Sequence, residues 1–365
     1  MPVFYKQTDN KKINIMRKQY VILAVILTIT LCFAACGEDP IDSGTTGNLS
    51  WTLTDNGTLT IKGNGAMPDY NISPWQNHKD AIKTIVISNG ITNIGEGAFQ
   101  YFSNLTSITI PNGITNIGDY AFYYCINLTD ISIPNGVKSI GDYAFSGCSE
   151  ITNITIPNSV TTIGSGAFWG CSELKDITIS NNVITIGDGA FWACGELTDI
   201  IIPNQITSIG NNVFSYCSGL TDITIPNSVK SIGEKAFANC RGLTNIVISN
   251  QVTSIGDYAF TNCLNLKSIT IPNNVASIGD GLFQNCTNLE IIILPNSVTY
   301  IGDSAFYNCT ALLQMTVKAK LVPTVRSSSF RSVNRSIPVY VPQESLQAYK
   351  DASAWREFNL QSRVF

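Results

Sequence analysis

The sequence is poor in charge and almost devoid of histidine. Charged residues make up only 13% of its 365 residues, against about 25% in an average soluble protein. His78 is the single histidine. The sequence therefore argues against a catalytic triad, an imidazole metal site or a histidine general base. The formal net charge of −4 excludes the basic footprint of a nucleic-acid-binding protein. With 44% hydrophobic residues, the chain is still too apolar to be disordered.

The usual signatures of catalysis are missing as well. The sequence holds no phosphate-binding loop, no nucleophile paired with a base, and no cluster of metal ligands at close spacing. It therefore predicts a protein that is not an enzyme and that needs no cofactor and no metal. What the chain does have is eleven cysteines.

Residues 1–35 are predicted to be a lipoprotein signal peptide. Arg17 and Lys18 precede the apolar run 21–31, which is shorter than the ~20 residues of a membrane span. Small residues then lead into Cys36, and this arrangement resembles the lipobox of bacterial lipoproteins, in which Cys36 would become the lipid-bearing N-terminus. Met16 is the more natural start, which would make residues 1–15 an extension. The alternative is an uncleaved N-terminal anchor. The expected location is the bacterial outer membrane, on the cell surface.

Nine of the cysteines recur at a constant interval of 23 residues, from Cys125 to Cys309. Apolar residues, Pro-Asn and Ile-Gly recur in the same frame, which extends upstream with Phe102 and Lys79 at the cysteine position. This gives ten repeats over residues 79–309. A fixed period of this length is the signature of a solenoid, in which each unit buries its apolar face against its neighbours.

Within one repeat the spacing predicts a short strand followed by a turn and a helical segment. Ile131 and Ile133 lie two apart and so share one face of a strand, and equivalent strands of successive coils can pair in parallel. Ile140 and Gly141 are expected to form the turn, and Asp142 to cap a helical turn. The predicted fold class is an α/β solenoid, with short parallel strands on one side and helical turns opposite.

Such an array needs caps, because its ends expose apolar core and unpaired strand edges. Residues 36–47 are expected to be a tether and residues 48–78 an N-terminal cap with a β-hairpin over 49–61, where Trp51 and Trp75 plug the core. Residues 310–365 are assigned to a partial repeat and a C-terminal cap with a closing helix over 345–358. Charge is divided between these parts, with a net −13 in residues 36–309 and +5 in residues 310–365.

The repeat unit and both flanks resemble the BspA-type leucine-rich repeats of bacterial surface proteins. The resemblance is carried by the Cys-x-x-Leu-x-x-Ile-x-Ile-Pro-Asn frame, by the Trp51 to Trp75 segment, and by the Val339 to Phe358 segment. It implies a leucine-rich-repeat array. It further implies adhesion to a host extracellular or cell-surface protein, which fold alone does not establish.

Each recurring position forms a column along the solenoid. The cysteine column is interpreted as buried structural thiols, because it lacks zinc-site spacing and parallel stacking would strain disulfides. The phenylalanine column is interpreted as core. The acidic column after Ile-Gly is interpreted as helix caps, with shared calcium sites as the alternative.

Two sets of exposed residues are candidates for ligand binding. The first is a polar ribbon on the strand face, made of Asp130, Asn153, Asp176, Asp199, Asp222, Thr155, Thr178 and Thr224. The second is an aromatic patch in the early coils, made of Tyr120, Tyr123, Tyr124, Tyr143, Trp169 and Trp192, with Tyr101 beside it. Exposed aromatics mark contact surfaces, although partial burial between the turns would explain them equally well.

The functional hypothesis is a non-catalytic, lipid-anchored surface protein that presents a binding face to host proteins. The alternatives are a glycan-binding accessory lipoprotein, since tryptophan and tyrosine suit sugar faces, or a structural protein of the envelope. The identity of the ligand and the orientation on the membrane are left open by the sequence.

Overall fold

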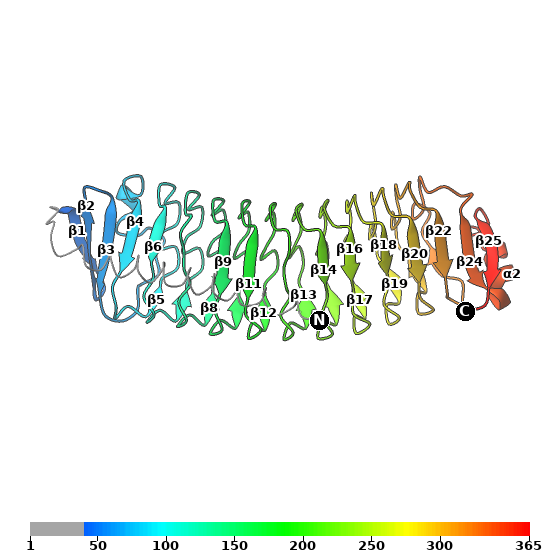
Figure 1. Cartoon of the computed structure of the whole chain (residues 1–365), viewed down its shortest axis with the longest axis horizontal. Helices are drawn as coiled ribbons and strands as arrows, with labels where there is room; N and C mark the ends of the chain where they lie inside the picture. The colour runs from blue at the N-terminus through cyan, green and yellow to red at the C-terminus, as the bar shows by residue number, and fades with distance from the viewer. Residues whose placement is uncertain (1–39) are drawn as a thin grey trace, which may run out of the picture.

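A computed structural model of the chain describes residues 40–365. It is an elongated stack of coils whose strands lie side by side along one axis (Figure 1). Successive coils pair in parallel at a shift of 23 residues, as in Asp176 with Asn153 and Ile177 with Ile154. The solenoid predicted from the period is therefore confirmed.

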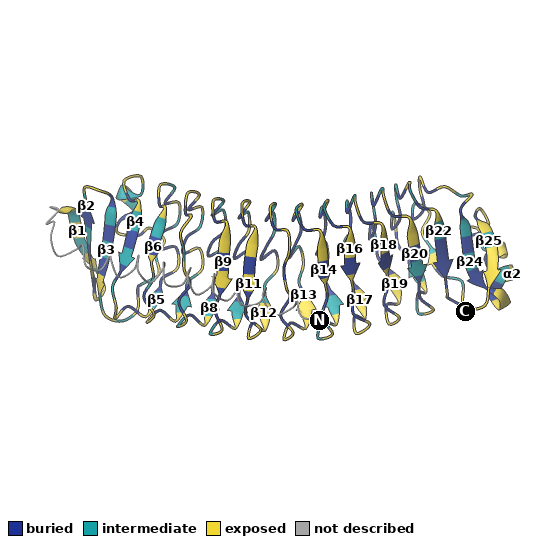
Figure 2. Ribbon diagram, in the orientation of Figure 1, coloured by how far each residue is buried: buried dark blue, intermediate teal, exposed yellow. Residues whose placement is uncertain are grey.

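In most coils the chain forms a strand in which buried and exposed residues alternate (Figure 2). In β9 and β11 the isoleucines are buried and the intervening Asn, Asp and Thr are exposed. Pairing of these strands is interrupted near residues 130–133 and 199–202, where isolated bridges replace the ladder. The strands of this face are β4 (Thr84–Ile87), β6 (Ser107–Thr109), β9 (Asn153–Ile156), β11 (Asp176–Ile179), β14 (Asp222–Thr224), β16 (Asn245–Val247), β18 (Ser268–Thr270), β20 (Ile291–Leu294) and β22 (Gln314–Val317).

A second ladder of two-residue strands follows in each coil. It includes Ser139–Ile140, so the position expected to begin a turn forms a strand that pairs with both neighbouring coils. These strands are β5 (Asn93–Ile94), β7 (Asn116–Ile117), β8 (Ser139–Ile140), β10 (Thr162–Ile163), β12 (Thr185–Ile186), β13 (Ser208–Ile209), β15 (Ser231–Ile232), β17 (Ser254–Ile255), β19 (Ser277–Ile278), β21 (Tyr300–Ile301) and β23 (Thr324–Val325).

The expectation of helical turns opposite the strands is wrong. The segment from the acidic column to the cysteine consists of tight turns. Its alternate amide groups donate to the next coil, as Tyr120 does to the Asp142 carbonyl (2.9 Å) and Phe122 to the Ala144 carbonyl (2.8 Å). Hydrogen bonds between coils thus take the place of the i→i−4 bonds of a helix.

One continuous core runs through the stack. Its centre is a ladder of phenylalanines from Phe99 to Phe330, with neighbouring ring centroids 5.2–5.8 Å apart. Trp75 stacks on Phe99 at one end (5.6 Å), and Trp355 packs edge-on against Phe330 at the other (5.4 Å). The indole N–H groups of the two tryptophans are satisfied by the carbonyls of Ala98 and Pro323. The caps close the ladder with large rings whose single polar atom is bonded.

The N-terminal cap contains the expected hairpin, β2 (Leu49–Thr54) with β3 (Thr58–Gly63), and the 3₁₀ helix η1 (Gln76–His78). Residues 40–46, in the segment expected to be a tether, form β1 (Pro40–Thr46), which pairs antiparallel with β2.

The C-terminal cap contains β24 (Pro338–Pro342), η2 (Gln343–Ser345), α2 (Leu346–Asp351) and β25 (Asn359–Arg363). The closing helix is shorter than expected, because residues 352–358 form turns that bury Trp355 and Phe358.

Candidate functional site

Two positions of each turn segment hold the backbone in the left-handed region. The first directly follows the acidic column, as at Tyr120 (φ 55°) and Tyr143 (φ 54°). The second directly precedes the cysteine position, as at Tyr101 (φ 65°) before Phe102, Tyr124 (φ 57°) before Cys125 and Tyr216 (φ 62°) before Cys217. Glycine or asparagine suits such positions, whereas other residues lose about 1–2 kcal/mol there. The tyrosines therefore occupy an unfavourable backbone conformation.

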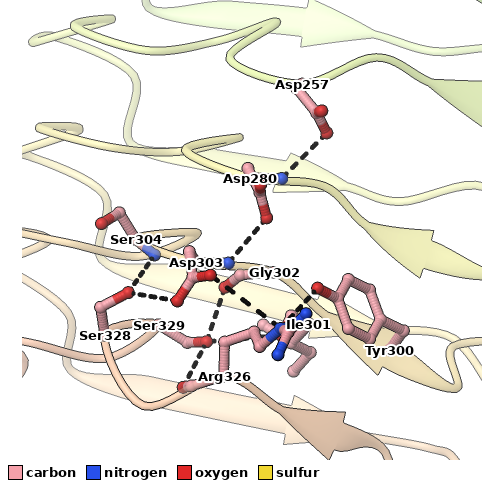
Figure 3. A network of polar contacts seen from close by, with 10 residues as sticks. All are labelled: Asp257, Asp280, Tyr300, Ile301, Gly302, Asp303, Ser304, Arg326, Ser328 and Ser329. Atoms are coloured by element: carbon pink, nitrogen blue, oxygen red, sulfur yellow. Dashed lines mark hydrogen bonds and ion pairs between the residues drawn. The ribbon is translucent and has the colours of Figure 1, made fainter.

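The acidic column does not cap helices but links coils. Asp257 Oδ1 accepts the amide N–H of Asp280 (2.9 Å), and Asp280 Oδ1 accepts that of Asp303 (2.8 Å), as Figure 3 shows. Asp303 ends the series by accepting the Ser328 hydroxyl (2.8 Å). Because one oxygen of each aspartate of the column from Asp119 to Asp280 accepts an N–H of the next coil, these aspartates form a ladder. Within residues 40–365 no group of three or more His, Cys, Asp or Glu residues is placed to hold a metal ion.

The nine repeat cysteines are free and buried, as the interpretation as structural thiols requires. Each thiol donates to the carbonyl of the phenylalanine in the preceding coil, with Sγ–O distances of 3.0–3.3 Å. Burial raises the pKa of Cys217 to about 12. A thiol held so far from its reactive thiolate form is suited to packing and not to redox chemistry.

All eight residues predicted for the polar ribbon are exposed on the strand face. Asp176 pairs with Asn153 on one side and bridges to Asp199 on the other, so the acidic side chains follow one another from coil to coil. Asp199, Asp222 and the exposed Ile201 line a shallow depression of about 260 Å³. The ribbon is a polar surface with acidic side chains in three successive coils, at Asp176, Asp199 and Asp222.

The predicted aromatic patch is a single run of contacting rings. Tyr120 stacks on Tyr143 (5.2 Å, 12°), Tyr143 contacts Trp169 (5.9 Å), and Trp169 contacts Trp192 (4.5 Å, 50°). The run also includes Tyr216, which contacts Trp192 at 5.2 Å. The sequence-based prediction of the patch did not include Tyr216, although this residue shares a repeat position with Tyr101 and Tyr124. The aromatic strip is hereafter Tyr101, Tyr120, Tyr123, Tyr124, Tyr143, Trp169, Trp192 and Tyr216.

The strip is exposed in part and surrounded by acids. The exposed fractions of Tyr101, Tyr120, Tyr124, Trp169 and Tyr216 lie between 36 and 48%. Residues 96–216 hold ten Asp or Glu and two Lys. The acidic column precedes the strip along each coil, and exposed glutamates such as Glu150 and Glu173 follow it. Partial burial, and to a smaller degree the neighbouring tyrosines, raise the pKa of the Tyr123 hydroxyl. The site is apolar at its centre and negative at its edges.

The predicted lipidation site, Cys36, lies outside the residues that the structure describes. Among residues 40–365, no helix is long and apolar enough to cross a membrane.

The 23-residue coils, the parallel ladder and the buried Phe and Cys columns define a leucine-rich-repeat solenoid. The family model for the BspA type leucine rich repeat region, in six copies, matches residues 75–198, 138–264 and 207–338. The chain therefore belongs to the BspA-type leucine-rich-repeat family. Repeat solenoids of this kind present an extended surface for binding and are typically non-catalytic.

Two solved structures share the fold. A leucine-rich repeat protein from Eubacterium ventriosum is 27% identical, with a TM-score of 0.53, and the match covers 80% of this chain and 95% of that one. A leucine-rich repeat protein from Bacteroides ovatus is 24% identical, with a TM-score of 0.56, covering 91% of this chain and 100% of that one. No curated protein matches the chain.

Proposed function

We propose that the protein is a lipid-anchored cell-surface protein of the bacterial outer membrane that binds a protein of a host matrix or host cell through the aromatic strip. The observation that carries this proposal is the strip itself. Eight contacting rings over six coils, with several of them more than a third exposed, make a larger aromatic surface than a solenoid needs for its own stability. Tyrosine and tryptophan dominate the energetics of protein interfaces.

The backbone supports the same proposal. In the later coils the second left-handed position carries Asn239, Asn262, Asn285 and Asn308, whose side chains form a ladder with N–O distances of 2.8–3.1 Å. Asparagine tolerates the left-handed conformation, and its side-chain amide forms hydrogen bonds with the asparagines of the neighbouring coils. It is therefore the residue that stabilises this position. The early coils hold Tyr101 and Tyr124 there instead. At this second position of the ten repeats the residues other than glycine and asparagine, namely Tyr101, Tyr124, Ala193 and Tyr216, all lie in the coils of the strip, and retained backbone strain is typical of functional sites.

The ring geometry favours a protein over a glycan. Sugars bind aromatic residues through an open ring face, whereas each ring of the strip has another ring of the strip within 6.1 Å. Stacking takes up one face of rings such as Tyr120 and Tyr143, so a partner meets single faces, edges and hydroxyls and not a flat open platform. Rigid tyrosine edges with hydroxyl groups are the contact type that antibody paratopes use on proteins.

The test uses cells that display the protein. Whole-cell proteolysis first establishes that the array faces outward. Binding to immobilised collagens and matrix glycoproteins is then compared with that of a variant carrying Trp169→Ser and Trp192→Ser. Serine occurs at the same repeat position in Ser146 and Ser215, so the fold should tolerate it. Loss of two interface anchors should weaken binding by about 30-fold or more.

The matched control is Tyr258→Asn with Tyr307→Thr, which removes two rings outside the strip. Asn212 and Thr261 occupy the corresponding positions of other coils. Equal loss of binding in the control and the tryptophan variant would contradict the role of the strip. Binding to a glycan array but to no protein would favour the glycan alternative, and protection from whole-cell proteolysis would rule out an adhesin.

A further inference from the structure

A pocket of about 330 Å³ lies where the N-terminal cap meets the first two coils, at one end of the aromatic strip. Its walls include Tyr70 from the cap and Glu96, Gln100, Tyr101, Tyr120 and Tyr123 from the coils. Four of these six side chains are tyrosines, and the only ionised one is a carboxylate. Neither Lys nor Arg lines the pocket.

The tyrosines face the pocket in different planes. Tyr123 stands edge-to-face with both Tyr101 (5.4 Å, 82°) and Tyr120 (5.4 Å, 80°). Tyr70 is fixed in the cap by a hydroxyl hydrogen bond with Thr46 (3.2 Å) and by packing against Trp75 (5.5 Å). A cage of pre-positioned rings at right angles offers a cation both ring faces and hydroxyl oxygens.

Glu96 differs from the other members of the acidic column. The aspartates around it use Oδ1 to accept an N–H of the next coil, as Asp119 does from Asp142 (2.7 Å). The Glu96 carboxylate makes no hydrogen bond or ion pair with any residue between 40 and 365. Its backbone is held on both sides, because its N–H donates to Asp69 Oδ1 (2.8 Å) and its carbonyl accepts the Tyr70 N–H (2.9 Å).

The other glutamate of the column provides the contrast. Glu234 contacts the ammonium of Lys235 at 2.6 Å, so its charge is already paired within the chain. At Glu96 the position that corresponds to Lys235 is occupied by Gly97, so no lysine follows this carboxylate. Glu96, the carboxylate of the column that lines the tyrosine pocket, is thus not paired with a lysine or arginine of residues 40–365.

The surroundings are negative as well. Burial raises the pKa of the Tyr120 hydroxyl, and Tyr143, Asp119, Asp142 and Glu96 raise it further. These groups all disfavour a negative charge at the pocket. The carboxylates of Asp119, Asp142 and Glu96 favour a positive charge there, whereas burial opposes a charge of either sign.

We propose that this pocket is an aromatic cage that takes a lysine or arginine side chain of the bound protein, with Tyr70, Tyr101, Tyr120 and Tyr123 around the cation and Glu96 as its counter-ion. The proposal rests on the proposed function and names the side-chain chemistry that the partner brings to the cap end of the strip. Cation–π contact within about 6 Å of several rings, together with a carboxylate, recognises ammonium and guanidinium groups. The negative field over residues 96–216 would guide a basic segment to the site.

The experiment measures binding of n-butylammonium, a probe for the lysine side chain, to the purified full chain by ligand-observed saturation-transfer NMR. Glu96→Gln should weaken binding by about five- to tenfold. Glu234→Gln, the same change in a coil without the cage, should leave it unchanged. Tyr101→Asn should also weaken it, while circular dichroism reports an intact fold, since asparagine fills this position in four other coils.

The outcomes are separable from those of the proposed function, because the probe needs no partner. No saturation transfer to n-butylammonium, or equal transfer in wild type and Glu96→Gln, would overturn the cage while leaving the strip as a binding surface. Much tighter binding of tetramethylammonium than of n-butylammonium would overturn the assignment to a protein side chain in favour of a free quaternary ammonium. Cage binding without any host protein binding would overturn the proposed function alone.

Discussion

The phenylalanine ladder makes a quantitative prediction about how the solenoid holds together. Phe191 lies near its middle and is fully buried. Its ring stacks on Phe168 (5.6 Å, 2°) and Phe214 (5.8 Å, 6°), so it belongs to two coil interfaces. Phe191→Ala keeps the backbone hydrogen bond from its amide to the Val213 carbonyl (3.0 Å) and removes only the ring.

The loss of stability in Phe191→Ala follows from the apolar area that the ring buries and from the cavity that its removal leaves. A buried phenylalanine covers about 150–250 Å², worth ~4–6 kcal/mol at 25 cal/mol per Å². Measured Phe→Ala changes in cores cost about 3–5 kcal/mol, which includes the cavity that remains. We therefore expect Phe191→Ala to lower the free energy of unfolding by about 4 kcal/mol. Because each coil contacts only its neighbours, weakening two adjacent interfaces should also uncouple the two halves of the stack.

The assay is urea unfolding followed by far-UV circular dichroism, with Trp192→Ser as the control. Trp192 is the next residue but is only partly buried, and serine occurs at its repeat position, so its loss should cost far less. The expected result for Phe191→Ala is a lower midpoint with a smaller slope or two transitions. A loss below about 1 kcal/mol with an unchanged slope would refute the ladder as the element that couples the coils.

Two further predictions concern the cysteines. Burial raises the pKa of Cys217 to about 12, whereas an unfolded thiol titrates near ~8.5. The folded state thus holds its thiol protons more tightly, so stability is fully present below about pH 8.5 and falls by about 1.4 kcal/mol per thiol per pH unit up to about pH 12. Urea unfolding between pH 7 and 10.5 should show this loss, with a shallower slope for Cys217→Ala. An equal slope in both proteins would contradict it. Cys36→Ser should abolish incorporation of labelled palmitate and release the protein from membranes, and palmitate retained in the variant would contradict lipidation at this residue.

The strands and the core could be predicted from the repeat, because they depend only on which residues recur and at what spacing. Ile131 and Ile133 alternate, the same pattern returns after 23 residues, and only parallel stacking buries every copy at once. The burial of Phe145 and Cys148 follows from the same period. Phe330 was not predicted as a member of the ladder, because it stands 24 residues after Phe306 and breaks the register.

The turn segment was predicted wrongly because its residues also suit a helix. An aspartate followed by Ala-Phe at helical spacing is typical of a capped helical turn. Glycine or asparagine at Gly97, Gly166 and Asn212 did signal left-handed backbone, but tyrosine at the same position in other coils hid the signal. Only the stacked coils show that the amides are satisfied by the neighbouring coil.

The sequence by itself determined the period, the buried columns and the two exposed surfaces, since each depends on which residues recur and at what spacing. Only the tertiary structure decided that the acidic column links coils, that Tyr216 joins the aromatic strip, and that a pocket forms around Glu96. The physical reason is that these features join groups from different coils or from the cap. Their distances depend on how one turn of the chain stacks on the next, which no single repeat specifies.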